Sequence, residues 1–90
     1  MRIQNAIHEV MGLKLSDYIG KSRKREGFYA RMIFVHHCRN EGATVISIAK
    51  EMQHNHATVI YYLKKYQDDY KFTPEFRDYV QAVQRRLSKD

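Results

Sequence analysis

The stretch VISIAKEMQHNHATVIYYLKKY, residues 45–66, decides the fold of this chain. Its apolar residues recur at helical spacing on both sides of a short polar break at Gln53-His54-Asn55. A break of this length is too short for anything except a tight turn between two helices, and helices joined in this way cross at a steep angle. The stretch therefore predicts a helix-turn-helix, with a first helix over residues 45–52 and a second from residue 56 to about residue 69.

The start of the second helix carries residue types suited to capping and to DNA contact. Asn55 is a good N-cap, because its side-chain oxygen can accept a hydrogen bond from a free amide of the helix. Capping there leaves His56, Ala57 and Thr58 in the first turn, the part of a helix-turn-helix that meets base edges. The turn contains no glycine, so we expect any left-handed backbone position to fall at Asn55 or His54, the residue types that tolerate it best. All five residues are candidates for DNA binding.

Positive charge is concentrated in one part of the sequence. The formal net charge is +6 and the isoelectric point is near 9.6. Residues 21–39 contain one acid, Glu26, and the basic residues Lys21, Arg23, Lys24, Arg25, Arg31 and Arg39. Such a focus favours a surface that faces a polyanion, and a glycine-flanked basic loop would reach a DNA backbone or a narrow minor groove. The alternative is a merely solvated basic loop.

A central helix over residues 26–40 is apolar on nearly all sides, which is typical of a helix buried in the core. Arg31 and Arg39 are about two turns apart on it. We therefore expect both to project from the same side, toward the partner of the basic loop. Gly42 is expected to end this helix and Thr44 to cap the next one.

The remaining segments also predict helices. Residues 2–11 have apolar positions at helical spacing and stop at Gly12. Ser16 is the expected N-cap of a short helix that ends at Gly20. Thr73 and Pro74 mark the start of a last helix with an apolar stripe. With no strand pattern, repeat or linker in the sequence, we expect one all-α domain over residues 1–90, with about five to six helices around a single core.

Several classes of function are disfavoured. The sequence has no run of 18 apolar residues and begins with an amphipathic pattern, so we expect a cytoplasmic protein that does not contact a membrane. The single cysteine, Cys38, agrees with a reducing compartment and is expected to be a small buried hydrophobe. Gly20-Lys21-Ser22 imitates the end of a P-loop, but that motif needs a glycine where Leu15 stands. No nucleophile has an evident base, so we expect no enzyme activity, no cofactor and no small-molecule substrate.

A metal site and a protein-interaction surface are the alternatives to a DNA-binding site. Candidates for a metal site are His36, His37, Cys38, His54 and His56. The first three are adjacent, which is not a usual zinc-ligand spacing, and neighbouring side chains on a helix diverge. A protein-interaction module would use the tyrosines at positions 61, 62, 66 and 70, which we expect instead to pack in the core. An RNA duplex is a poorer partner than DNA for a helix-turn-helix, because its major groove is deep and narrow.

Two segments together, GKSRKREGFYARMIFVHHCRNEG and ISIAKEMQHNHATVIYYLKK, resemble the C-terminal DNA-binding domain (domain IV) of the bacterial replication initiator DnaA. The resemblance covers nearly the whole chain. It implies a TrpR/DnaA-C-like fold that binds double-stranded DNA, at a DnaA-box-like site, in connection with replication initiation or its regulation.

The resemblance also implies a role for each matching residue. Basic contacts fall on the loop and the long helix, at Lys21, Arg23, Arg25, Arg31 and Arg39. Among these, Arg23 would enter the minor groove and Arg31 would contact a phosphate. His56 takes the place of a signature histidine at base edges, Thr58 that of a threonine that holds the backbone, and Val59 would anchor the helix in the core.

The chain departs from the family in its turn, which is about one residue shorter and lacks paired glycines. His54 and Asn55 stand where the family usually has arginine and aspartate, and Ala57 where it usually has serine or threonine. Asparagine can bond adenine in a bidentate way, so we expect the preferred bases to differ, and Ala57 could pack on a thymine methyl.

The chain has no room for an ATPase domain, so it could not open an origin by itself. We expect a competitor or regulator at initiator sites, a mobile-element accessory, or a piece of a full initiator. A replication initiator or ATPase would then be a partner. The alternative is a protein-interaction module, or a mobile-element accessory protein with only non-specific DNA affinity.

Overall fold

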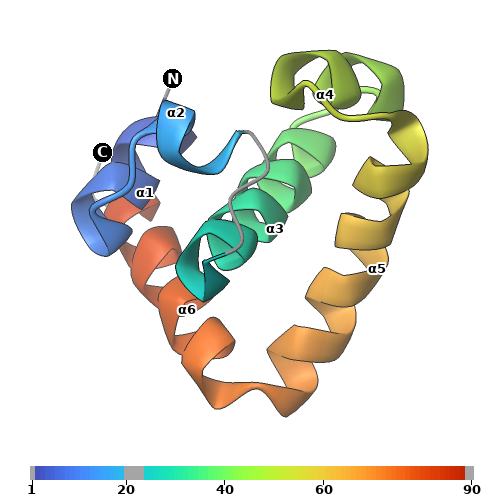
Figure 1. Cartoon of the computed structure of the whole chain (residues 1–90). Helices are drawn as coiled ribbons and strands as arrows, with labels where there is room; N and C mark the ends of the chain where they lie inside the picture. Colours follow the sequence, from blue (N-terminus) through green and yellow to red (C-terminus); the bar gives the residue numbers. More distant parts are fainter. Residues whose placement is uncertain (1, 20–23, 89–90) are drawn as a thin grey trace.

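The computed structural model describes residues 2–19 and 24–88, and this part of the chain forms six α-helices without a strand (Figure 1). In chain order they are α1 (Arg2–Met11), α2 (Leu15–Tyr18), α3 (Arg25–Asn40), α4 (Val45–Met52), α5 (His56–Phe72) and α6 (Pro74–Ser88). The all-α prediction is confirmed.

Helix α3 is the centre of the domain, as its nearly all-apolar sequence predicts. Residues 29–35 are buried without interruption, and the side chains of Met32, Phe34 and Val35 are fully buried. α5 and α1 pack against α3, α2 contacts the middle of α3 through Tyr18, and α4 packs near the C-terminal end of α3. Because α3 is buried on most sides, the other helices can pack their apolar faces around it.

The last helix closes the fold against the first. α6 packs along α1 and α5. At the α5 side, the Phe76 ring meets the rings of Tyr29 (centroids 5.2 Å apart) and Tyr66 (5.4 Å, edge to face). At the α1 side, Arg86 forms an ion pair with Glu9. The two ends of the described chain therefore lie side by side in Figure 1.

The predicted helix boundaries are close to those observed, with one wrong cap. α1 ends before Gly12, which has φ +72°, and α6 begins at Pro74. Ser16 is not the N-cap of the short helix. α2 begins at Leu15, and the backbone N–H of Lys14 donates to the Asp17 carboxylate at 2.8 Å. The Asp17 carboxylate thus bonds back to the backbone of the N-cap residue, and the helix begins two residues earlier than a cap at Ser16 would place it.

α5 continues to Phe72, three residues beyond the expected end near residue 69. No helix in the described residues is long and apolar enough to cross a membrane.

Candidate nucleic-acid interface

The helix-turn-helix is built by two side-chain caps. Thr44 Oγ1 accepts a hydrogen bond from the backbone N–H of Ser47 at 3.1 Å and so starts α4. Asn55 Oδ1 accepts from the backbone N–H of Thr58 at 2.8 Å and so starts α5. Both caps were predicted from the sequence and both are confirmed. Each cap satisfies one of the free backbone amides at the start of its helix.

The left-handed residue in the turn is Gln53 (φ 59°, ψ 38°), so the expectation of His54 or Asn55 was wrong. The cause is the way α4 ends. The N–H of His54 donates to Ala49 O at 3.0 Å and the N–H of Gln53 to Lys50 O at 3.2 Å, a pair of bonds that requires a left-handed residue directly after the helix. The turn thus adopts a glycine-type conformation without glycine, which costs of the order of 1 kcal/mol.

Asn55 is more engaged than its sequence suggests. Its Oδ1 accepts not only from the backbone N–H of Thr58 but also from the Thr58 hydroxyl at 2.9 Å. A carbonyl oxygen has two lone pairs, and both are used here. A bidentate bond from Asn55 to adenine would need that same oxygen, so it would have to break the cap of α5.

One side of α5 faces solvent over its first three turns. The residues on that side are His56, Ala57, Ile60, Tyr61 and Lys64. The exposed fraction is 39% for Ile60 and 52% for Tyr61, which is high for large hydrophobic residues on a packed helix. The opposite side, with Val59, Tyr62 and Tyr66, is buried in the core. The exposed side of α5 is therefore available to enter a groove.

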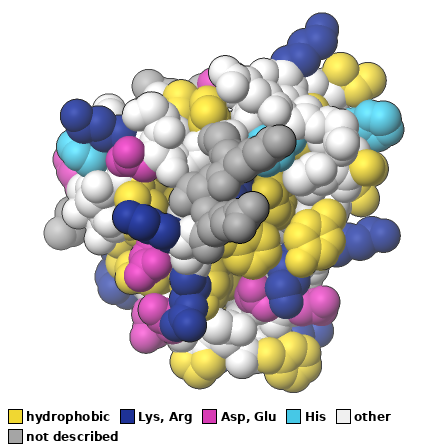
Figure 2. All heavy atoms as spheres, in the orientation of Figure 1, with side chains coloured by type: hydrophobic (Ala, Val, Ile, Leu, Met, Phe, Trp, Pro, Cys, Tyr) yellow, Lys and Arg dark blue, Asp and Glu magenta, His cyan; other side chains and the backbone are white. Residues whose placement is uncertain are grey.

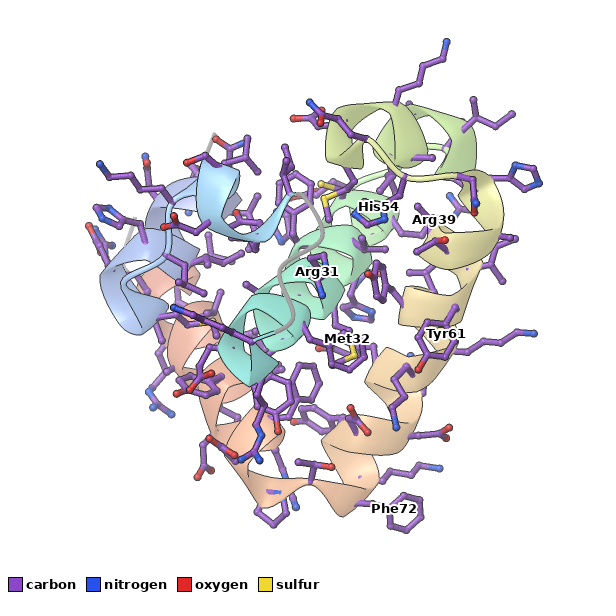
Figure 3. All side chains as sticks on the ribbon, viewed as in Figure 1. Arg31, Met32, Arg39, His54, Tyr61 and Phe72 are labelled. Carbon is purple, nitrogen blue, oxygen red and sulfur yellow. The ribbon has the colours of Figure 1, made fainter. Side chains whose placement is uncertain are left out.

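Arg31 does not project beside Arg39 as expected. Its side chain is only 6% exposed, and Figure 3 shows it among the side chains between α3 and α5. Its Nε donates to the Tyr62 hydroxyl at 2.9 Å, its guanidinium lies 5.7 Å from the centre of the Tyr62 ring, and one terminal nitrogen donates to Tyr18 O at 3.3 Å. The expectation failed because Tyr62, 31 residues away in sequence, offers a buried acceptor.

His54 also points inward. Its Nε2 lies 3.0 Å from the backbone oxygen of Ile19, and its ring meets the Tyr62 ring edge to face. Arg31 and His54 thus bind successive carbonyls at the end of α2, those of Tyr18 and Ile19. We call Arg31, His54 and Tyr62, with these two carbonyls, the α2 anchor. It ties the end of α2 to the helix-turn-helix.

The other basic candidates lie at the surface. Arg39 is exposed and donates to Ala43 O at 3.1 Å, where it satisfies a carbonyl just beyond the end of α3. Lys24 and Arg25 are exposed at the start of α3, and Arg25 lies 3.3 Å from a carboxylate oxygen of Glu75. Lys21 and Arg23 lie outside the described residues. Figure 2 shows lysine and arginine side chains spread over this face, with acidic side chains between them.

The histidines and the cysteine considered as metal ligands do not form one cluster in the described part of the chain. The described residues contain no group of three or more histidine, cysteine, aspartate or glutamate side chains placed to hold a metal ion. His36 stacks on the Tyr66 ring with centroids 3.7 Å apart, and burial lowers its pKa. Burial raises the pKa of Cys38 to about 11, so its thiol is neutral at physiological pH.

A comparison with known protein families identifies the family of this helix-turn-helix domain. The model of the family described as the bacterial dnaA protein helix-turn-helix matches residues 1–65. The chain belongs to this family. The match includes α1 to α4 and the exposed side of α5 through Lys64, and it confirms the resemblance drawn from the basic segment and the turn. No curated protein matches the chain. Membership of the DnaA helix-turn-helix family supports DNA binding connected with replication initiation.

Two residues on the exposed side of α5, Ile60 and Tyr61, were not predicted as DNA contacts from the sequence. Tyr61 was grouped with the tyrosines of the core, whereas Tyr62 and Tyr66 are buried and Tyr61 is not. Ile60 was not considered at all. The signal was present in the spacing, because Ile60 lies four positions after His56 and Tyr61 four positions after Ala57, and residues four apart share a side of a helix.

Proposed function

We propose that this DnaA-family domain binds duplex DNA with a sequence preference, by placing the first turns of α5 in the major groove. The observation that carries the proposal is the exposure of His56 and Ala57 at the capped start of α5. In a helix-turn-helix this turn is the one that contacts base edges. His56 can donate to or accept from a base, and Ala57 can pack on a thymine methyl.

The next two turns of α5 would extend the contact. Ile60 lies one turn after His56 and offers an apolar surface to a base edge, while Lys64 lies one turn further, where a lysine reaches a phosphate. Tyr61 stacks on Phe28 of α3, with ring centroids 6.5 Å apart, so its exposed ring is held in place. We therefore expect Ile60, Tyr61 and Lys64 to contact the DNA as well.

Phosphate contacts would come from the start of α3. Lys24 and Arg25 are exposed there, and the ion pair between Arg25 and Glu75 is at the surface, where such pairs contribute about 0–1 kcal/mol. Arg25 can therefore exchange this partner for a phosphate at little cost. From the family resemblance, Lys21 and Arg23 would act beside them. Arg31 and His54 would support the interface from inside, through the α2 anchor.

We infer that the chain acts by binding and not by catalysis. Its role would be that of a competitor or regulator at initiator sites, or that of the DNA-binding part of an initiator whose ATPase is supplied elsewhere. A duplex with a DnaA-type box is the natural first ligand, although the departures at His54, Asn55 and Ala57 favour a shifted base preference.

The test compares two single substitutions on α5. His56→Ala should weaken binding to the preferred duplex by about 1–3 kcal/mol and leave binding to a scrambled duplex nearly unchanged. Lys64→Ala should weaken binding to both duplexes and lower the slope of log K against log salt by about 1. Equal losses from His56→Ala on both duplexes would remove His56 from base recognition.

A further inference from the structure

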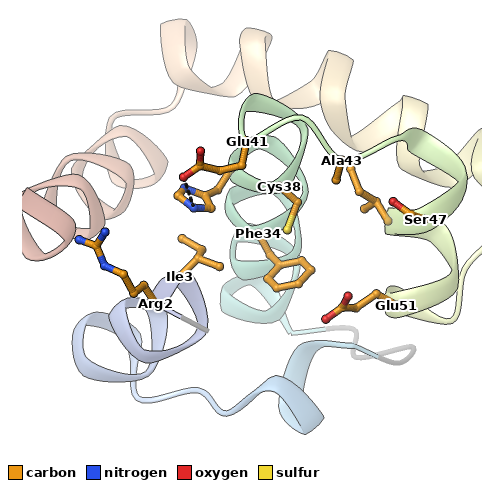
Figure 4. Close-up of a pocket in the computed structure, with 10 residues that line it drawn as sticks. Arg2, Ile3, Phe34, Cys38, Glu41, Ala43, Ser47 and Glu51 are labelled. Atoms are coloured by element: carbon orange, nitrogen blue, oxygen red, sulfur yellow. Dashed lines mark ion pairs between the residues drawn. The ribbon is translucent and has the colours of Figure 1, made fainter.

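A cavity of about 390 Å³ opens between α1, α3 and α4. Figure 4 shows Phe34 and Cys38 on its floor, with Ile3 on one side and Ser47 and Glu51 on the other. Its volume lies in the range of sites that bind small ligands or single large side chains, about 300–1,000 Å³. The proposed DNA contact does not use this cavity, because none of the residues that line it belongs to α5 or to the proposed DNA contacts.

The charged side chains that line the cavity are acidic on balance, with the carboxylates of Glu41 and Glu51 against the guanidinium of Arg2, although the whole chain carries a net charge of +6. Glu41 and Glu51 both line it. Glu41 lies 3.5 Å from His37 within the cavity wall, and Glu51 has no ion pair or hydrogen bond with another described residue. Both carboxylates lie close enough to Cys38 to raise its pKa, in addition to burial, which is the main cause of the rise. An occupant that matches the cavity is apolar and carries a positive charge beside its apolar group.

The chain presents such a group at its other end. Phe72, the last residue of α5, is 79% exposed, which exceeds the exposure of Ile46 (65%) and Tyr61 (52%). Figures 2 and 3 show hydrophobic side chains at the surface of the α5–α6 corner, with Phe72 pointing away from the domain. The N–H of Thr73 donates to Asp69 O at 2.8 Å and α6 begins at the next residue, so the backbone that carries Phe72 belongs to a hydrogen-bonded corner between two helices.

The charges near Phe72 also match. Lys71 is exposed beside it. Within the two turns that precede Phe72, Lys65 and Asp69 form an ion pair with an N–O distance of 3.1 Å. Outside this ion pair, the last turns of α5 carry two positive side chains, Lys64 and Lys71, and one negative side chain, Asp68. The end of α5 therefore has a net positive charge.

We propose that Phe72 of one copy of the chain inserts into the cavity between α1, α3 and α4 of a second copy, with Lys71 facing the carboxylates of Glu41 and Glu51. Phe72, the knob, stands at the corner between α5 and α6, whereas the cavity is lined by α1, α3 and α4. The contact is therefore head to tail and leaves a free knob and a free cavity for further copies. α5 separates Phe72 from His56 by about 24 Å at 1.5 Å per residue, so the DNA-contacting turn stays free. The inference does not depend on the proposed function, since it needs no DNA.

Sedimentation equilibrium of the 90-residue chain tests the contact without DNA. The average mass of the wild type should rise with concentration. Phe72→Ser should weaken self-association at least about tenfold, because a buried aromatic anchor commonly dominates such an interface. Ser47→Trp, which fills the cavity, should do the same. The matched control is Ile46→Ser, which removes another exposed large side chain and should leave the strength of self-association unchanged. Circular dichroism checks that each variant is folded.

Mixing the two defective variants gives the sharper result. Phe72→Ser keeps its cavity and Ser47→Trp keeps its knob, so an equimolar mixture should form a one-to-one dimer although neither variant associates alone. Charge exchange gives a second check. Glu51→Lys and Lys71→Glu should each weaken association, and their mixture should recover part of it.

Three outcomes would overturn the proposal: a wild type that stays monomeric up to millimolar concentration, a mixture that does not associate, or loss of association in Ile46→Ser as large as in Phe72→Ser. Association that survives in Phe72→Ser but not in Ser47→Trp would assign the cavity to another segment and would also exclude Phe72 as its occupant.

Discussion

The hydroxyl of Tyr62 offers the most direct test of the α2 anchor. In Tyr62→Phe the ring stays in place, so its contact with the Arg31 guanidinium, 5.7 Å from the ring centre, is kept. Only the acceptor of the 2.9 Å bond from Arg31 Nε is lost. Arg31 is 6% exposed, so water replaces this acceptor poorly.

A hydrogen bond to a charged group contributes about 1.5–3 kcal/mol, and the variant gains a little because it no longer buries a hydroxyl. We expect Tyr62→Phe to lower the free energy of unfolding by about 1–2 kcal/mol. For a domain of this size, each kcal/mol corresponds to about 4–8 °C in Tm. Urea and thermal unfolding followed by far-UV circular dichroism measure both quantities.

The neighbouring tyrosine provides the control. Tyr61 is half exposed, so Tyr61→Phe should change stability by less than about 0.5 kcal/mol. The cost of Tyr62→Phe should also shrink when Arg31 is already replaced by Met, because the two residues share one bond. Equal effects of Tyr62→Phe and Tyr61→Phe, or an unchanged cost in the Arg31→Met background, would refute the anchor.

Three further predictions concern stability. Gln53→Gly should stabilise the domain by up to about 1 kcal/mol in urea unfolding, because Gln53 is left-handed at φ 59°; a loss of stability would contradict this. Tyr18→Phe should be neutral or stabilising in the same assay, because the buried Tyr18 hydroxyl has no hydrogen-bond partner among the described residues, and a loss above about 1 kcal/mol would reveal one. Burial lowers the pKa of His36, so the unfolded chain binds its proton more readily and stability should fall as the pH drops below 6.5; His36→Gln should reduce that fall, and an unchanged pH profile would exclude His36 as its source.

Local signals in the sequence predicted the helix-turn-helix well. The spacing of apolar residues defines α4 and α5, and the caps at Thr44 and Asn55 depend on side chains that bond a backbone amide three residues away. Such information is contained within a few residues. The left-handed position at Gln53 was missed because it depends on where α4 ends and which carbonyls its last turn leaves free.

The surroundings of the basic residues were less predictable. Arg31 and Arg39 share a side of α3 by spacing, yet Arg31 is buried and Arg39 is exposed. The difference arises from Tyr62 and from the end of α2, which the fold brings to Arg31 from distant parts of the chain. His54 turns inward for the same reason. Helical spacing gives the direction of a side chain but not the partner that meets it there.

Sequence preference on duplex DNA is the central claim, and fluorescence anisotropy measures it directly. A duplex with a DnaA-type box and a scrambled duplex of the same length and composition would each be titrated with the chain at several salt concentrations. We predict that binding to both falls steeply with salt and that the box is preferred by at least about tenfold, or ~1.4 kcal/mol. Equal affinity for both duplexes would contradict recognition of that box by α5, and the absence of salt-dependent binding to either would contradict DNA binding itself.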